Sequence, residues 1–149
     1  MMSESEGYGA PVIETEGEFA GWQCWKSDPF EARSGPYYMK REEGGGHVCA
    51  FRAAPQHMNA GGFMHGGCLM TFADFSLFAI ATDELQGANA VTMNLSSDFL
   101  GAVEDGALVE ARGEVTRGGG KTIFVRGLVT ADGKPALSFT GIIRRLSGR

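Results

Sequence analysis

The part of this sequence best suited to chemistry is a glycine-rich turn that leads directly into an apolar segment with one carboxylate. The turn spans residues 59–67, with the sequence Asn-Ala-Gly-Gly-Phe-Met-His-Gly-Gly, and Asp74 follows seven positions later. Leu, Met, Phe, Ala and small hydroxyl residues surround Asp74, and no Lys or Arg occurs between positions 52 and 112. Because no cation on the same helical ridge can neutralise this group, we expect Asp74 to be a buried carboxylate with a specific function.

A helix must position the turn and the acid, and the apolar composition predicts one from Gly66 to about Glu84. At the start of this helix the backbone N–H of Gly66 has no intrahelical acceptor. The helix dipole makes it a donor that can polarise a carbonyl and hold an oxyanion. A residue without a side chain also lets a substrate carbonyl approach closely. The alternative is an ordinary glycine-rich start of a helix, which we disfavour because Asp74 follows.

The spacing of Gly66 and Asp74 predicts an assembly of at least two chains. Eight helical residues span about 12 Å along the axis, which is too far for both groups to meet one carbonyl from the same chain. We therefore expect the two residues to act together from different subunits.

Length and composition describe an ordinary globular protein. The chain has 149 residues, 43% of them apolar and 21% charged, with a formal net charge of −5, so we expect one domain and no nucleic-acid partner. The three cysteines lack close spacing and clustered histidines, which predicts neither a disulfide framework nor a metal site and favours a reducing cytoplasm. The acidic N-terminus differs from a secretory signal, and the longest apolar run, about fifteen residues, is too short to cross a membrane.

The elements along the chain predict an α+β domain. Residues 1–18 are acidic and glycine-rich, so we expect a flexible tail and a single domain over residues 19–149. The aromatic segment 19–25 fits either a short helix over an apolar surface or a plain part of the core. Strands are predicted at residues 37–42 and 47–53, as a hairpin, and then at 91–99, 108–117, 121–130 and 136–146.

The strand at 91–99 is predicted to be half-buried, because its residue types alternate. One predicted face has Val91, Met93, Leu95 and Phe99, and the other has Thr92, Asn94, Ser96 and Asp98. Short links between the strands imply an antiparallel sheet of about six strands, which must curl around the helix to bury it. Such a sheet keeps free edges and an uncovered face, so we expect pairing with a second copy.

The order of hairpin, His-Gly-Gly helix and four long strands resembles the hotdog-fold acyl-CoA thioesterases of the phenylacetyl-CoA thioesterase type. The resemblance covers roughly residues 36–146, and its most specific part is the pattern Asn59-x-x-Gly62-x-x-His65-Gly66-Gly67 followed by Asp74. It implies a hotdog fold and hydrolysis of an acyl- or aryl-CoA to the free acid and coenzyme A. It also implies a homodimer, often paired into a tetramer, with active sites at the dimer interface and no metal or prosthetic group.

The resemblance also implies roles for individual residues. Asp74 of one chain faces the Gly66 oxyanion site of the other and acts as general base on water or as the nucleophile, unless it is only structural. Asn59 either helps to hold the thioester carbonyl or only shapes the turn. His65 orients the loop through its ring nitrogens rather than transferring protons. Thr92, eighteen residues after Asp74, lies where a strand hydroxyl in related enzymes places the water, although a strand Thr needs no such role.

Three further residues are candidates for substrate binding. Gly67 lies in the same turn as Gly66. The glycines at 118–120, followed by Lys121, superficially resemble a phosphate-binding loop, but the required first glycine is missing and a strand follows instead of a helix. Arg117 and Lys121 flank this turn, and they either bind the phosphates of coenzyme A or are solvated residues of a hairpin.

Two other functions are compatible with this fold. A catalytically silent acyl-CoA-binding protein is one, although such a protein gains nothing from a desolvated carboxylate. A hydratase or dehydratase is the other, and it would need a catalytic histidine paired with an acid. His65 is the candidate histidine, and the His-Gly-Gly pattern favours the thioesterase. Fold alone does not choose among these functions, and the sequence does not define the acyl group.

Overall fold

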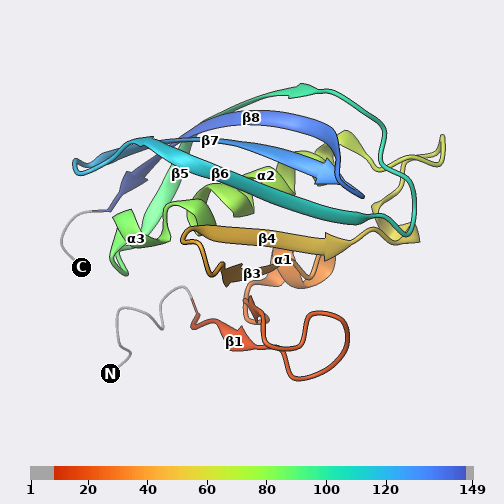
Figure 1. Ribbon diagram of the computed structural model, residues 1–149, viewed down its shortest axis with the longest axis horizontal. Helices are drawn as coiled ribbons and strands as arrows, with labels where there is room; N and C mark the ends of the chain where they lie inside the picture. The colour runs from red at the N-terminus through yellow and green to blue at the C-terminus, as the bar shows by residue number, and fades with distance from the viewer. Residues whose placement is uncertain (1–8, 147–149) are drawn as a thin grey trace.

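An antiparallel sheet curls around the long helix α2 in the computed structural model, which describes residues 9–146 (Figure 1). The strand order is β1-β2-β3-β4-β6-β7-β8-β5, and each neighbouring pair is antiparallel. This is the predicted hotdog fold, with the six predicted strands and two additional strands of two residues each, β1 and β2. The elements are β1 Val12–Ile13, β2 Gln23–Cys24, α1 Pro29–Ser34, β3 Tyr38–Arg41, β4 His47–Arg52, the 3₁₀ helix η2 Pro55–His57, α2 Gly66–Ile80, α3 Thr82–Leu85, β5 Ala90–Phe99, β6 Leu108–Arg117, β7 Thr122–Ala131 and β8 Lys134–Arg145.

The strands β6, β7 and β8 are neighbours in the sheet because short turns join them in sequence. At the β7–β8 turn, Asp132 and Gly133 have φ angles of 48° and 82°. A two-residue hairpin turn requires this left-handed region, which glycine and short polar residues adopt most readily. These three strands agree with the predicted ones to within two residues at each end.

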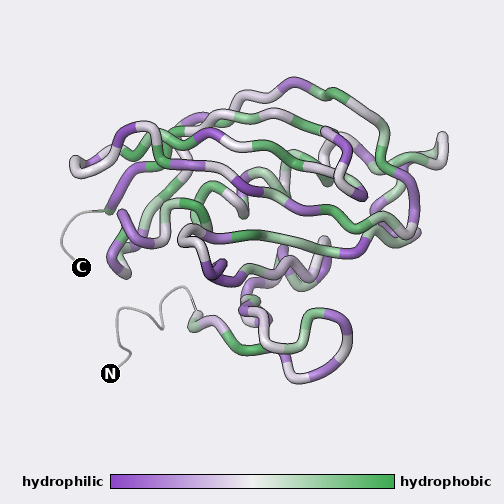
Figure 2. Tube along the Cα trace, viewed as in Figure 1, coloured by the Kyte–Doolittle hydropathy of each residue, from purple (hydrophilic) through white to green (hydrophobic). Residues whose placement is uncertain are grey.

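The helix α2 forms the centre of the core, inside the curl of the sheet. Its residues Phe72 and Leu77 are fully buried and pack among apolar residues of the surrounding strands. Figure 2 shows apolar residues along α2 and along the strands around it. At Gly141 of β8, a Cβ atom would lie 2.4 Å from Leu77 Cδ1, so only glycine lets the helix lie this close to the sheet. This close approach fixes the rotation of α2 and therefore the direction of its polar residues.

The predicted helix from Gly66 to about Glu84 is confirmed as far as Ile80, but it is not continuous, because a second helix, α3, is separated from α2 at Ala81. Thr82 Oγ1 donates hydrogen bonds to Ala79 O at 2.6 Å and to Phe78 O at 3.3 Å. A hydroxyl that bonds to carbonyls of the preceding turn competes with the backbone ladder and favours a bend in the helix.

The N-terminal segment contains more structure than the sequence predicts. Residues 1–8 of the predicted tail lie outside the described residues, but Val12–Ile13 form β1 and pair with β2. Glu18 forms an ion pair with Arg52 of β4. Within the described residues, the sheet therefore begins before the predicted boundary at residue 19.

A short helix does occur near the N-terminus, but it lies after the segment where the sequence suggested one. Residues 19–25 form a turn and β2, so the helical alternative for this segment is wrong, and Trp25 packs edge-on against Phe75 at 5.9 Å. The helix α1 follows, and the Asp28 side chain caps it by accepting the amides of Phe30 and Glu31 at 3.0 Å. This helix borders the cavity beside Asp74.

Candidate active site

Asp74 and Thr92 form the acid half of the candidate site, between α2 and the edge strand β5. Thr92 Oγ1 donates a hydrogen bond to Asp74 Oδ1 at 2.6 Å. The other carboxylate oxygen, Oδ2, has no hydrogen-bond partner within residues 9–146 and is free to accept one from water or substrate. Asp74 is only half-buried in this chain, not buried as predicted, because one side of it opens into a cavity of about 360 Å³.

A β-bulge in β5 lets Thr92 reach Asp74. The predicted alternation places Thr92 on the opposite face from Leu95, which would turn its hydroxyl away from the helix. The register between β5 and β8 instead shifts between Thr92 and Asn94, so Met93 is an extra residue in the strand. Thr92 and Leu95 therefore both face α2, and the predicted faces are wrong before the bulge. Alternating residue types in a strand give no signal for an inserted residue of this kind.

His65 organises the start of α2. Its ring Nδ1 accepts a hydrogen bond from the Gly67 N–H at 2.9 Å, which makes it the N-cap of the helix. Its own backbone N–H donates to His57 O at 2.8 Å. The Gly67 amide is therefore engaged with a side chain of the protein.

The Gly66 amide is the open donor at this end of the helix. Of the first four amides of α2, all within the described part of the chain, Gly66 alone has no acceptor, since Gly67, Cys68 and Leu69 each donate to His65. A Cβ atom at position 66 would lie 3.2 Å from two ring carbons of Phe99, so Gly66 lies against the end of β5. A free amide at the positive end of a helix is suited to hold an oxyanion.

Asn59 closes the glycine turn that precedes α2. Its side-chain oxygen accepts hydrogen bonds from Gly61 N at 2.9 Å and from Phe63 N at 3.2 Å. Gly62, between them, has a φ of 89°, a conformation that favours glycine. Asn59 thus shapes the turn through its oxygen, and its amide nitrogen has no acceptor within residues 9–146.

The structure separates Arg117 and Lys121 from Gly66 within one chain. Both cations are exposed and flank the β6–β7 turn, which Figure 1 shows at the opposite end of the sheet from the turn before α2. Gly118 in this turn lies close to the side chain of Glu84, near the end of α3. A single chain therefore cannot present these cations and the Gly66 amide to the same part of a ligand.

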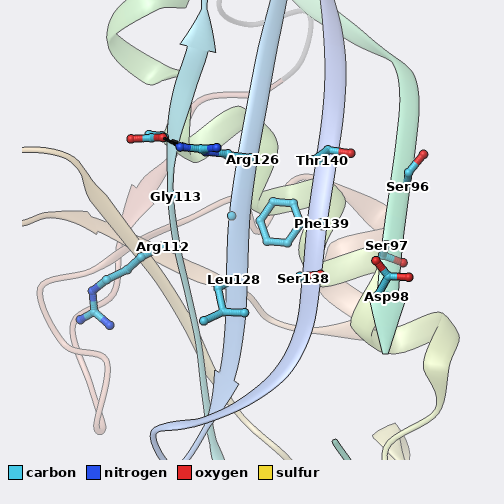
Figure 3. Close-up of a pocket in the computed structure, with 12 residues that line it drawn as sticks. Ser96, Ser97, Asp98, Arg112, Gly113, Arg126, Leu128, Ser138, Phe139 and Thr140 are labelled. Carbon is cyan, nitrogen blue, oxygen red and sulfur yellow. Dashed lines mark hydrogen bonds and ion pairs between the residues drawn. The ribbon is translucent and has the colours of Figure 1, made fainter. Parts of the chain in front are cut away.

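A larger hollow than the cavity beside Asp74 lies on the face of the sheet that points away from α2 (Figure 3). Its volume is about 710 Å³, and none of the predicted site residues lines it. Its two arginines are already paired, Arg126 with Glu114 at 2.7 Å and Arg112 with Glu42 at 2.9 Å. The smaller cavity beside Asp74 is therefore the better candidate for the site.

The described part of the chain contains no group of three or more His, Cys, Asp or Glu side chains arranged to hold a metal ion. The cysteines at positions 24, 49 and 68 are free thiols. None of the helices in residues 9–146 is long and apolar enough to cross a membrane.

Comparisons with known proteins identify the family. The family model described as the thioesterase superfamily matches residues 61–136, which is 76 of the 149 residues. The chain is also 29% identical, over 119 residues, to a Pseudomonas aeruginosa protein whose name describes it as an esterase, with coverage of 79% of this chain and 89% of that protein.

Two solved structures support the same assignment. A mutant of the phenylacetic acid degradation protein PaaI from Thermus thermophilus is 32% identical, with a TM-score of 0.67 and coverage of 80% of this chain and 100% of that chain. A Bacillus halodurans protein crystallised with CoA is 25% identical, with a TM-score of 0.68 and coverage of 74% of each chain. The chain belongs to the thioesterase superfamily, and it is a thioester hydrolase with the hotdog fold.

Proposed function

We propose that this protein hydrolyses an acyl-CoA thioester to the free acid and coenzyme A, at a site shared between two subunits. The observation that supports this most directly is the hydrogen bond from Thr92 to Asp74, which orients a carboxylate toward an open cavity. The unengaged Gly66 amide supplies the complementary donor. The similarity to a Bacillus halodurans protein crystallised with CoA supports coenzyme A as the leaving group.

In the proposed reaction, the thioester carbonyl oxygen accepts a hydrogen bond from Gly66 N–H and from the amide of Asn59. Asp74 then acts in one of two ways. As general base it removes a proton from water while the water oxygen adds to the carbonyl carbon, and as nucleophile its free oxygen adds to that carbon directly. In both cases the tetrahedral oxyanion collapses and the C–S bond breaks with release of the coenzyme A thiolate; on the nucleophile route this leaves an anhydride between the acyl group and Asp74, which water then hydrolyses to the free acid and the Asp74 carboxylate. Thr92 keeps the carboxylate in one orientation throughout.

The second subunit is proposed to bind along β5. This strand pairs with β8 on one side only, within residues 9–146, and it exposes Val91 by 40%, Met93 by 57% and Phe99 by 57%. An edge strand with exposed apolar side chains is a site for pairing with another chain. A homodimer formed here, either alone or as half of a tetramer, would cover the open side of Asp74.

A twofold axis beside β5 would run the two α2 helices antiparallel. The N-terminal end of one helix would then lie toward the C-terminal end of the other, where the β6–β7 turn is found. We propose that Arg117 and Lys121 of one subunit bind the coenzyme A phosphates while the thioester lies at Gly66 of the other, with Gly67 in contact with the substrate. A cytoplasmic location is proposed with this activity, because the three free thiols suit a reducing compartment.

The position of His65 disfavours a hydratase or dehydratase. Its Nδ1 is committed to the Gly67 amide, and no carboxylate within residues 9–146 is hydrogen-bonded to its ring. A general-base histidine needs such an orienting partner.

The test of the proposed function is release of free thiol from a panel of aryl, short-chain and long-chain acyl-CoAs. We expect turnover of at least one of these, at a rate proportional to the concentration of the purified protein. A protein that binds the panel members and releases no thiol would be a silent binding protein instead.

A further inference from the structure

The cavity beside Asp74 has two further carboxyl groups in its wall, those of Asp28 and Glu31. The cavity lies between α1 with its N-cap and α2, and it is lined by Asp28, Phe30 and Glu31 on one side and by Met70, Thr71, Asp74 and Phe75 on the other. Three of these seven side chains, Phe30, Met70 and Phe75, are apolar and can contact a hydrocarbon group, and three others are carboxylic acids. None of the residues that line it, all of them within the described chain, is Lys or Arg.

Glu31 separates this cavity from a second one of about 170 Å³, which is bordered by Trp25, Lys26 and Tyr37. The Oε1 atom of Glu31 is buried and has no hydrogen-bond partner within residues 9–146. Lys26, on the far side of the second cavity, pairs with Glu14 at 3.0 Å instead. The Glu31 carboxyl is thus placed between two cavities without a counter-charge.

Glu31 changes its charge near neutral pH. Burial and then the nearby Asp28 and Asp74 carboxylates raise the pKa of Glu31 to about 7. The other titratable groups on the elements around it are Cys24 of β2, Lys26 and Tyr37. Burial raises the pKa of Cys24 and of Tyr37, so both are neutral at pH 7. Glu31 is therefore mainly neutral at about pH 6 and mainly ionised at about pH 8.

We propose that Glu31 is a specificity-determining residue, which makes this cavity a pocket for uncharged acyl groups and excludes acyl groups that end in a carboxylate. The inference rests on the proposed function, in which the carbonyl carbon lies beside Asp74. The acyl chain then extends into this cavity, along Phe30, Met70 and Phe75, because the coenzyme A moiety must lead out to solvent. A terminal carboxylate on that chain would approach Glu31 and Asp74 with no cation to pair with, and such like-charge contacts reject a ligand.

The experiment compares pairs of substrates that differ in charge and hardly in length. Each pair is a dicarboxylic acyl-CoA, glutaryl or adipoyl, and its terminal methyl ester. The quantity measured is the ratio of kcat/KM for the ester to kcat/KM for the acid, with the wild type and with Glu31→Gln, at pH 6 and pH 8. The terminal carboxylate of the substrate is ionised at both pH values, so a change in the ratio reports on the enzyme.

We expect the wild-type ratio at pH 8 to exceed that of Glu31→Gln by about tenfold, because the amide keeps the size of the side chain and removes its charge. The wild-type ratio should also rise several-fold from pH 6 to pH 8, and the ratio of the variant should not. Glu43→Gln, an exposed residue in the β3–β4 turn, is the matched control and should keep the wild-type ratio.

Equal ratios in the wild type and Glu31→Gln, or a wild-type ratio that does not change with pH, would overturn the assignment of Glu31. If Glu31→Gln does not fold, the change of the wild-type ratio between pH 6 and pH 8 is sufficient to test the role of Glu31. Failure of the proposed function would give a different result, namely no hydrolysis of any uncharged acyl-CoA by the wild type.

Discussion

The two halves of the candidate site differ in how the chain builds them. The oxyanion half, at the start of α2, is built by contacts within a few residues, with Asn59 closing the turn and His65 capping the helix. The acid half joins Asp74 to Thr92, eighteen positions away, and depends on a bulge in an edge strand. The first half is therefore complete in one chain, and the second opens on the side where β5 has no partner within residues 9–146.

This difference indicates how the proposed shared site can be both rigid and dependent on assembly. The turn holds its donor in place before substrate binds, because its polar groups are already bonded. The acid has one oxygen fixed by Thr92, and we expect a second subunit to enclose the other. Substitutions in the first half should therefore affect activity by removing or blocking the donor, and substitutions in the second half by removing or misplacing the carboxylate.

The largest expected effect is that of Asp74→Asn. The amide keeps the shape of the side chain and can still accept a hydrogen bond from Thr92, but it is neither a base nor a nucleophile. General-base assistance alone contributes about 10²–10⁴-fold, so kcat should fall by at least that range while acyl-CoA binding is kept. Thiol release and isothermal titration measure the two quantities. Asp105→Asn, an exposed residue in the β5–β6 connection, is the control and should have the wild-type rate. A near-normal rate for Asp74→Asn would leave only the silent binding protein.

Gly66→Val should have the next largest effect. A Cβ atom at this position would already lie 3.2 Å from the Phe99 ring, and the branched side chain would fill the space in front of the amide. Loss of an oxyanion donor costs about 10²–10³-fold in kcat. Circular dichroism and the oligomeric state should stay unchanged, which separates a blocked amide from a misfolded turn.

The proposal that the site is shared between subunits gives Gly66→Val a second test. Asp74→Asn and Gly66→Val chains, mixed under conditions that allow subunit exchange, should regain activity, because each heterodimer has one site with both wild-type groups. If the mixture stays inactive although heterodimers form, Asp74 and Gly66 do not act across the interface.

The fold could be predicted from the sequence because its signals are local. The β7–β8 turn and the apolar strands around it define the central hairpins to within two residues. The glycine-rich turn likewise marked the start of α2 at Gly66. Residue types fixed by turn geometry or by burial can be recognised within a short window.

The parts that could not be predicted depend on contacts between distant segments. The bulge at Met93 is a property of the register with β8, and the strand β1 exists only because β2 lies beside it. The position of Glu31 at the cavity of Asp74 depends on how α1 packs against α2, which no pattern within either helix indicates. The prediction that Asp74 is buried was wrong for the same reason, since the exposure of its side chain depends on what covers β5.

A smaller effect is expected for Thr92→Val, which removes the hydroxyl and keeps the branched shape. A hydrogen bond to a charged group contributes about 1.5–3 kcal/mol, so kcat should fall by roughly tenfold to a hundredfold, with little change in KM. Thr92→Ser restores the hydroxyl and should recover most of the rate. The variant Thr122→Val, at the start of β7 and outside the lining of the cavity, controls for loss of a strand hydroxyl. If Thr92→Val, Thr92→Ser and Thr122→Val all have the wild-type kcat, Thr92 has no role in the reaction.

The smallest expected effect is that of Asn59 on stability. Asn59→Ala removes two hydrogen bonds within an exposed turn, which should lower the free energy of unfolding by about 1 kcal/mol and Tm by about 2–4 °C. Asn59→Asp keeps the accepting oxygen and should restore Tm, but it lacks the amide N–H that we propose to contact the thioester oxygen. We therefore expect the Tm of Asn59→Asp to return to the wild-type value while its kcat stays below that of the wild type. Wild-type kcat in that variant would assign Asn59 to the turn alone, and the oxyanion would then depend on the Gly66 amide by itself.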